Sequence, residues 1–325
     1  MSLRRWIKTA AVMAAVLLCA LGLWLWLDPF RVVLADYARQ RVLAGLTRNA
    51  VKIDDHRWVY AYNDEAPAGA PTVVMIHGFT GSKENWYPLA QRLRGRYRLF
   101  APDLPGWGES ERHAGGDYGF VAQNDRVARF IEQVARKPGS EVVLLGHSMG
   151  GGIVALTAAR HPRVVDRVGL FDAAGVRFQD NAFGLAVLRG KNPFAVSDAA
   201  SLRRYIDIVF YDDAAKPVIP WPADRIYIDR RKRDAGFEQS VLDKIGRGDE
   251  RFLPGEAAAD IRQPALLLWC RQDAVIDVSA MDLYAARLPQ AQRVLLDGCG
   301  HMSIVERPEP AAQAVNRLIA EGRPR

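Results

Sequence analysis

Cysteine is scarce in this 325-residue chain, which contains only Cys19, Cys270 and Cys299. Three cysteines do not provide the even framework of a disulfide-stapled scaffold, and neither a C-x-x-C pair nor a histidine cluster with metal-ligand spacing is present. Gly106-Trp107-Gly108 lacks the length and placement of a dinucleotide-binding loop. We therefore expect no metal and no cofactor. We expect Cys270 and Cys299 to be buried free thiols, with a disulfide between them as the alternative in an exported domain.

A strong charge of one sign is also missing from most of the chain. The sequence holds 44 basic and 37 acidic side chains, a formal net charge of +7. Residues 1–50 account for seven of the basic and two of the acidic residues, so most of the excess belongs to the N-terminus. The remainder is nearly neutral, with 37 basic and 35 acidic residues. Because a nucleic-acid surface needs a concentration of positive charge, we do not expect nucleic acid as a partner.

One long apolar run is present, and it lies at the N-terminus. Thr9 to Leu27 carries no charge and is bounded by Lys8 and Asp28, which is enough helix to cross roughly 30 Å of hydrocarbon. A cleaved signal peptide is the alternative, but the run is long for one, and Leu18-Cys19-Ala20 is a poor cleavage site. We therefore predict an uncleaved, single-pass membrane anchor over residues 1–29.

Basic residues flank the apolar run on both sides and bear on its orientation. Those before it are Arg4, Arg5 and Lys8, and those after it are Arg31, Arg39 and Arg41. The first cluster is nearer the run and no acidic residue offsets it, so the positive-inside rule keeps the N-terminus in the cytoplasm. In a Gram-negative bacterium, the protein would then sit in the inner membrane with the following domain in the periplasm.

The most informative motif of the chain is Gly146-His147-Ser148-Met149-Gly150. It follows the apolar run 142–145 and precedes a segment, 151–156, that has the composition of a helix start. A G-x-S-x-G sequence between a strand and a helix holds the serine on a strained turn with its hydroxyl exposed. Ser148 is therefore the candidate nucleophile, and His147 occupies a variable, structural position.

A serine hydroxyl is a weak nucleophile at neutral pH, so a base must take its proton and an acid must orient that base. In folds with this elbow the base follows the serine in the chain, which leaves His161 and His301. His161 lies at the far end of the helix that begins beside Ser148, where it caps the helix or faces solvent. His301 follows the strand 293–297 in a glycine-rich loop, the position from which residues of parallel sheets reach a ligand. His301 is the candidate base.

The acid should follow the preceding strand. Residues 264–270 form a continuous apolar run, as expected of a strand buried on both faces, and Asp273 comes directly after it. Asp277 is the competing carboxylate, but it lies farther from the strand end. Asp297 is more consistent with a turn before the histidine loop. We therefore predict that Asp273 is the acid.

An oxyanion hole combines the N–H of the residue after the serine with an N–H from the loop after an earlier strand. The apolar strand 72–76 is followed by a loop that begins His77-Gly78-Phe79. The predicted backbone donors are therefore Phe79 and Met149. We interpret His77 as a residue that braces this loop.

Apolar strands alternate with helical segments through most of the chain, which predicts a mostly parallel sheet with helices on both faces. The predicted strands are 72–76, 97–101, 141–145, 166–171, 264–270 and 293–297, preceded by an antiparallel hairpin, 51–53 with 57–62. The alternation stops between 176 and 252, where we predict a helical cap inserted over the sheet. We predict that residues 30–50 form a linker with an amphipathic helix over 30–48. The core is then formed by residues 51–175 together with 253–325.

The apolar residues of the cap have two interpretations. They either line an acyl pocket above Ser148 or pack the cap onto the core, and for any single residue packing is favoured. The residues concerned include Phe183, Leu185, Leu188, Phe194, Ile219 and Trp221.

These motifs resemble the α/β-hydrolase superfamily over about residues 51–322, and more closely its membrane-anchored monoacylglycerol lipase and esterase branch. The resemblance is carried by His77–Lys83, Asp103–Gly108, Gly146–Gly151, Gln272–Val278 and Cys299–Pro308. It implies the triad Ser148, Asp273 and His301, and an oxyanion hole formed by Phe79 and Met149. One departure is Trp269-Cys270, where the family usually has a glycine after the tryptophan.

The sequence thus predicts a serine carboxylester hydrolase that acts at a membrane on acyl esters such as monoacylglycerols, through an acyl-enzyme intermediate. Hydrolases that cleave carbon–carbon bonds in aromatic ring-fission products share the same three residues and a similar cap, but they are typically soluble. A non-catalytic membrane scaffold is the remaining alternative. The scaffold is disfavoured because every triad position is filled.

Overall fold

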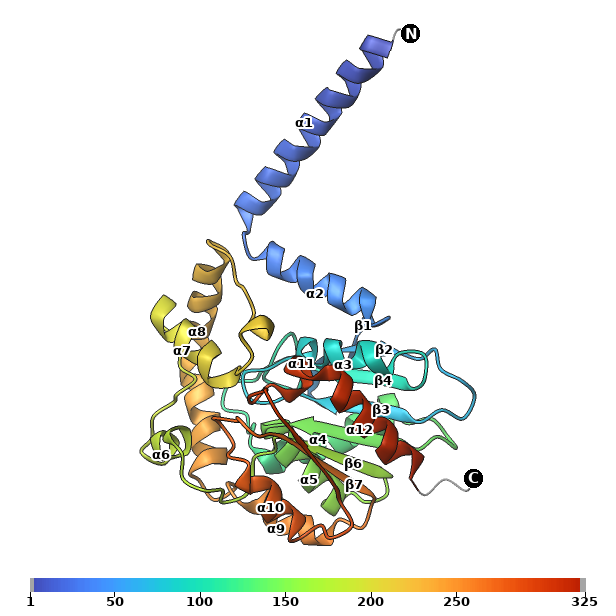
Figure 1. The fold of residues 1–325 in the computed structure, drawn as a ribbon, viewed down its shortest axis with the longest axis vertical. Coiled ribbons are helices and arrows are strands. Elements are labelled where there is room, and N and C mark those ends of the chain that lie inside the picture. Colours follow the sequence, from blue (N-terminus) through green and yellow to red (C-terminus); the bar gives the residue numbers. More distant parts are fainter. Residues whose placement is uncertain (1–2, 322–325) are drawn as a thin grey trace.

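The structure, a computed structural model, describes residues 3–321 and is built on an eight-stranded sheet (Figure 1). The strand order is β1-β2-β4-β3-β5-β6-β7-β8. Strands β3 to β8 are parallel to one another, and the β1–β2 hairpin joins β4 in the antiparallel sense. The strands are β1 Thr47–Ile53, β2 His56–Asn63, β3 Thr72–Ile76, β4 Arg98–Pro102, β5 Val142–His147, β6 Arg167–Phe171, β7 Ala265–Cys270 and β8 Gln292–Leu296. The predicted mostly parallel sheet is confirmed.

Helices cover both faces of the sheet because alternate residues of each strand point to opposite sides. In β3, Val74 and Ile76 pack in one core cluster with α4 and α5, whereas Val73 and Met75 pack in a second cluster with α3 and α12. The bounds of these and the adjoining helices are α3 Tyr87–Leu93, α4 Phe120–Phe130, α5 Met149–Arg160, α10 Ser279–Ala285, α11 Ser303–Glu306 and α12 Pro308–Ala320. With both faces covered, the open place for a ligand is the carboxyl edge of the sheet.

Two helices precede the sheet. Helix α1, Leu3–Leu27, projects away from the body of the molecule, and α2, Arg31–Leu43, lies between α1 and the sheet (Figure 1). Helix α2 is shorter than the predicted 30–48. Gly45, with φ of +67°, turns the chain, and Thr47 already begins β1.

The segment between β6 and β7 is helical. It contains α6 Ala182–Leu188, α7 Ala199–Val209, a 3₁₀ turn over Asp213–Ala215, α8 Ala223–Gly246 and α9 Leu253–Ala257. Helices α6, α7 and α8 lie together beside one end of the sheet (Figure 1). We refer to 176–252, which contains these three helices, as the cap, and its boundaries stay a prediction.

Candidate active site

Ser148 lies in the turn between β5 and α5 with φ of +55° and ψ of −120°. A side chain rarely adopts this backbone conformation, so the surrounding structure must hold it there. The flanking glycines explain how that is done. A Cβ on Gly146 would lie 2.2 Å from the Gly150 carbonyl oxygen, and a Cβ on Gly150 would lie 2.3 Å from the Ile76 carbonyl oxygen. Only glycine permits these approaches, so the turn presents Ser148 at the carboxyl edge of the sheet.

The three predicted triad side chains meet at this edge. The imidazole Nε2 of His301 lies 2.8 Å from Ser148 Oγ, and its Nδ1 lies 2.8 Å from Asp273 Oδ2. With the proton on Nδ1, the ring donates to Asp273 and its Nε2 accepts from the serine hydroxyl. The second carboxylate oxygen of Asp273 accepts the N–H groups of Val275 and Ile276, at 2.7 and 3.0 Å. This arrangement can move a proton from the hydroxyl to the imidazole.

The competing residues lie elsewhere. Asp277 accepts the N–H of Ser279 at 2.9 Å and has no part in the histidine contact. His161, at the carboxyl end of α5, contacts Asp125. Asp277 is therefore not placed to orient His301, and His161 is not placed to accept the proton of Ser148.

Burial determines the protonation of the histidine. His301 is almost fully buried, and desolvation of its charged form lowers its pKa to about 3. Burial raises the pKa of the Asp273 carboxyl, and the N–H donors of Val275 and Ile276 oppose that rise. At neutral pH the imidazole is therefore neutral and has a free acceptor for the serine proton.

The loop after β3 passes directly beside the serine. A Cβ on Gly78 would lie 2.9 Å from Ser148 Cβ, which places the backbone next to Phe79 against Ser148. His77 holds this loop. Its Nδ1–H donates to the Gly78 carbonyl at 2.8 Å, and its Nε2 accepts the Leu104 N–H at 3.0 Å. The predicted bracing role of His77 is confirmed, and the donor roles of Phe79 and Met149 stay a prediction.

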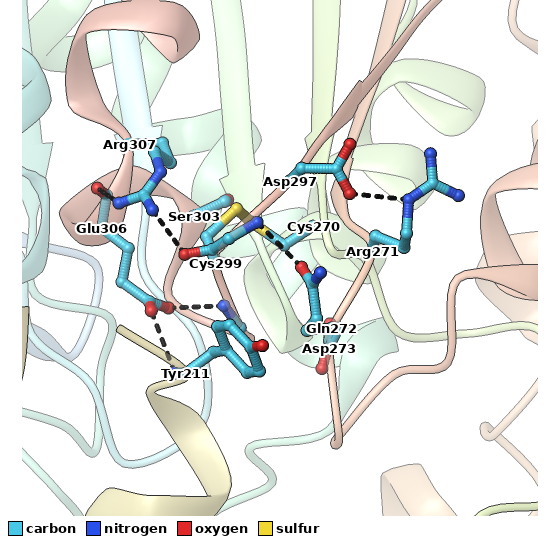
Figure 2. Close-up of a disulfide and its surroundings, with 12 residues drawn as sticks. Tyr211, Cys270, Arg271, Gln272, Asp273, Asp297, Cys299, Ser303, Glu306 and Arg307 are labelled. Carbon is cyan, nitrogen blue, oxygen red and sulfur yellow. Dashed lines mark hydrogen bonds and ion pairs between the residues drawn. A yellow bond between two sulfur atoms is a disulfide. The ribbon is translucent and has the colours of Figure 1, made fainter. Parts of the chain in front are cut away.

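Cys270 and Cys299 form a disulfide, so the expectation of two free thiols was wrong (Figure 2). The reason lies in the strand register. Strands β7 and β8 are parallel neighbours with Cys270 opposite Leu296, and the chain after Leu296 brings the Cα of Cys299 to 5.4 Å from that of Cys270. The bond ties the loop that carries Asp273 to residues 297–301, which we call the base loop after the role predicted for His301. It lies three residues before Asp273 and two before His301.

Two carboxylates that the sequence analysis missed hold the base loop. Glu306 accepts the N–H of Tyr211, in the cap, at 3.0 Å (Figure 2). It also accepts the N–H groups of Gly300 and of the cap residue Asp212, at 2.9 and 2.7 Å. It thereby connects the loop before His301 to the end of α7. Its place in the family-like stretch Cys299–Pro308 was the available signal.

The second missed carboxylate is Asp172, which directly follows β6. It accepts the Cys270 N–H at 2.9 Å and the hydroxyl of Ser303. Burial raises its pKa, and the nearby charge of Asp273 adds to that rise. The signal for Asp172 was the same as that for Asp273, a carboxylate at the end of an apolar strand. His147 completes this support, because its Nε2–H donates to the His301 carbonyl at 2.6 Å.

Two cavities meet at Ser148. The smaller, about 150 Å³, lies between the core and the cap. Its walls are mostly apolar and include Phe183, Val187, Phe194, Leu242 and Ile245. The larger, about 1120 Å³, extends from Ser148 and His301 to α2 and to residues 217–220 of the cap. Of the apolar cap residues singled out from the sequence, Leu185 and Trp221 line neither cavity.

Comparison with known proteins agrees with this geometry. The sequence profile described as "Alpha/beta hydrolase family" matches residues 73–314. The chain belongs to this family. Lipase 1 of Psychrobacter immobilis is 30% identical over 254 residues, covering 77% of this chain and 76% of the relative. The human monoacylglycerol lipase ABHD6 is 26% identical over 306 residues, covering 91% of this chain and 88% of its own.

A solved structure adds to these relatives. The crystal structure of a membrane phospholipase A, a bacterial virulence factor, superposes with a TM-score of 0.82 at 32% identity and covers 96% of this chain and 98% of its own. The predicted fold class, and the predicted enzyme class of a lipase or esterase, are confirmed. A meta-cleavage product hydrolase superposes with a TM-score of 0.68 at 22% identity, which shows a shared fold alone.

The lowered pKa of His301 gives a prediction for the pH profile. The ordinary pKa of histidine is 6.5, and a base whose pKa is lowered stays neutral at more acidic pH. We expect the acidic limb of kcat/KM on a water-soluble ester to have its midpoint clearly below pH 6.5. Circular dichroism at each pH controls for unfolding. A limb centred at or above pH 6.5 would contradict this account of the site.

Proposed function

We propose that the protein is a serine carboxylester hydrolase that cleaves monoacyl esters such as monoacylglycerols at a membrane. The observation that carries the proposal is the chain of hydrogen bonds from Ser148 through His301 to Asp273, located where an apolar cavity meets a wider one. The lipases among its relatives support the same activity.

The proposed reaction has two halves. Ser148 Oγ attacks the ester carbonyl carbon while its proton moves to His301 Nε2, and a tetrahedral oxyanion forms. The bond to the alcohol oxygen then breaks, and His301 returns the proton to the leaving alcohol. A water molecule attacks the acyl-enzyme in the second half, again giving its proton to His301. The carboxylic acid leaves, and Ser148 regains its proton.

Asp273 orients the imidazole and stabilises it while it carries the extra proton, without itself taking that proton. Phe79 and Met149 would donate their N–H groups to the oxyanion. Their placement on the β3 loop and at the first residue of α5 supports this role. One such donor contributes roughly 2.7–4 kcal/mol to the transition state.

The two cavities suggest how the substrate is placed. The smaller cavity offers an apolar surface suited to an acyl chain, and its walls come from the cap, the β3 loop, the start of α5 and residues 275–276. The wider cavity then receives the alcohol part and connects the site to the outside. In the wall of this wider cavity, a hydrogen bond of 3.0 Å between Thr80 Oγ1 and the Tyr205 hydroxyl joins the β3 loop to α7.

We also propose that α1 anchors the enzyme in a membrane with the catalytic domain in the periplasm. Residues Arg5–Trp24 are long and apolar enough to span a bilayer, by length and composition. Disulfides persist in oxidising compartments, so the Cys270–Cys299 bond favours export.

The triad assignment predicts the effect of substitutions. Ser148→Ala, Asp273→Ala and His301→Ala should each lower ester hydrolysis by at least ~10³ while leaving the fold intact, because the three residues act as a unit. Asp277→Ala is the matched control and should cost much less. Initial rates on a p-nitrophenyl ester, with circular dichroism of each variant, make the comparison. A mild Asp273→Ala beside a severe Asp277→Ala would refute the assignment of the acid.

Acyl specificity is a second test of the proposal. Each buried methylene contributes up to ~0.8 kcal/mol, so kcat/KM should rise with chain length until the smaller cavity is filled. We expect medium or long monoacyl esters to be preferred over acetate, in rates measured on p-nitrophenyl esters and monoacylglycerols from C2 to C16. A flat or falling profile from C2 to C8 would count against the acyl cavity. Hydrolysis of a ring-fission dienone, with no hydrolysis of the esters, would indicate that the protein is a carbon–carbon bond hydrolase.

The orientation has its own test. Protein in the inner membrane should be released by detergent but not by carbonate or salt, and protease added to spheroplasts should digest the catalytic domain. Protection in intact spheroplasts, with digestion only after lysis, would place the domain in the cytoplasm.

A further inference from the structure

Large apolar side chains are rarely exposed on the body of this protein. In residues 46–321, those that are exposed all lie in the cap: Leu185, Leu188, Tyr211, Val218 and Trp221. Val218 and Trp221 are the most exposed, at 88% and 72%, and they lie three residues apart. Both belong to residues 216–222, which join the 3₁₀ turn Asp213–Ala215 to α8 and which we call the cap connection. So concentrated an exposure in one short segment indicates a contact surface.

The cap connection lies beside the N-terminal helices. The guanidinium of Arg230, in the second turn of α8 after the connection, stacks over the ring of Phe30 at 4.0 Å. The end of α8 that carries the connection is the part of the cap closest to the junction of α1 and α2 (Figure 1). Helix α2 and residues 217–220 also line the same large cavity that leads to Ser148. The connection therefore lies where α1 leaves the body.

Three features identify a lipid surface as the partner. Trp26 and Leu27, at the end of α1, are 83% and 69% exposed, so the apolar surface of the anchor continues to the junction beside the connection. Trp221 is a side chain typical of the membrane–water interface. Arg225 lies over its ring at 5.8 Å, where its charge can remain at the level of the headgroups.

We propose that the cap connection is a second membrane contact, in which Val218 and Trp221 enter the leaflet where α1 ends. The proposal rests on the proposed anchoring by α1 and adds a defined orientation to it. With the connection in the leaflet, the mouth of the larger cavity opens at the lipid surface. A monoacyl ester then moves from the bilayer to Ser148 without crossing water.

A fluorescent probe on the full-length protein tests the contact. Val218→Cys in a Cys19→Ala background is labelled with an environment-sensitive dye without reductant, so that Cys270 and Cys299 stay bonded. The protein is placed in vesicles of phosphatidylethanolamine and phosphatidylglycerol with or without doxyl-labelled lipid. We expect blue-shifted emission that the doxyl lipid quenches. Leu185→Cys, an exposed apolar position on α6, is the control and should show neither effect.

Other outcomes of the probe experiment would overturn the proposal. Solvent-like, unquenched emission at position 218 would show that the connection stays in water. A blue shift that the doxyl lipid does not quench, and that depends on protein concentration, would show that a second copy of the chain covers the surface instead.

Activity measurements separate this contact from the proposed function. Trp221 lines neither cavity, so Trp221→Glu should leave hydrolysis of soluble p-nitrophenyl butyrate within about twofold of wild type and lower hydrolysis of monoacylglycerol in vesicles at least about fivefold. Trp221→Phe should retain both activities, and Leu185→Glu is the control that should change neither.

The failures are distinguishable. If the wild type hydrolyses neither ester, the proposed function fails, and the quenching at position 218 still shows whether the connection touches lipid. If the wild type leaves the vesicles, the anchor fails, and the membrane contact fails with it. If the wild type is active and bound while Trp221→Glu matches it on both substrates, only the second contact is refuted. If Trp221→Glu loses both activities, the quenching at position 218 decides whether the cap connection touches the membrane.

Discussion

The strained turn at Ser148 is the constraint on which the rest of the site depends. Its positive φ places the hydroxyl at the edge of the sheet, and it exists only because Gly146 and Gly150 let three backbone segments pass within contact distance. Parallel strands then bring the other groups to the same edge, since β5, β7 and β8 all end there. The Asp273 and His301 loops follow β7 and β8 and reach the serine from that side. A sheet of this order therefore brings the three proposed triad residues together without long loops.

A second set of interactions keeps the histidine in place. The base loop is tied to β7 by the Cys270–Cys299 bond, to β6 through Ser303 and Asp172, and to the cap by Glu306. Glu306 therefore connects the end of α7 in the cap directly to the loop that carries His301. The same cap lines the smaller cavity, and in our proposals that cavity holds the acyl chain and the cap touches the membrane.

The sequence was sufficient for the parallel sheet and for the three predicted triad residues, but it missed Asp172 after β6 and every contact that depends on strand register. Ser148, Asp273 and His301 each follow an apolar strand, and that pattern can be read along the chain. The disulfide could not be predicted in this way, because only the pairing of β7 with β8 brings Cys270 and Cys299 together. Glu306 binds N–H groups of the distant Tyr211 and Asp212, a contact with no local signal. The end of α2 was missed because Gly45 turns the chain earlier than the apolar pattern suggested.

Covalent labelling tests the central claim, that Ser148 is a nucleophile activated by His301, most directly. The full-length enzyme in detergent is treated with a fluorophosphonate and digested, and the adduct is located by mass spectrometry. We predict a single modified peptide that carries the adduct on Ser148, with labelling much slower in His301→Ala. An adduct on another residue, or equal labelling of wild type and Ser148→Ala, would contradict the account.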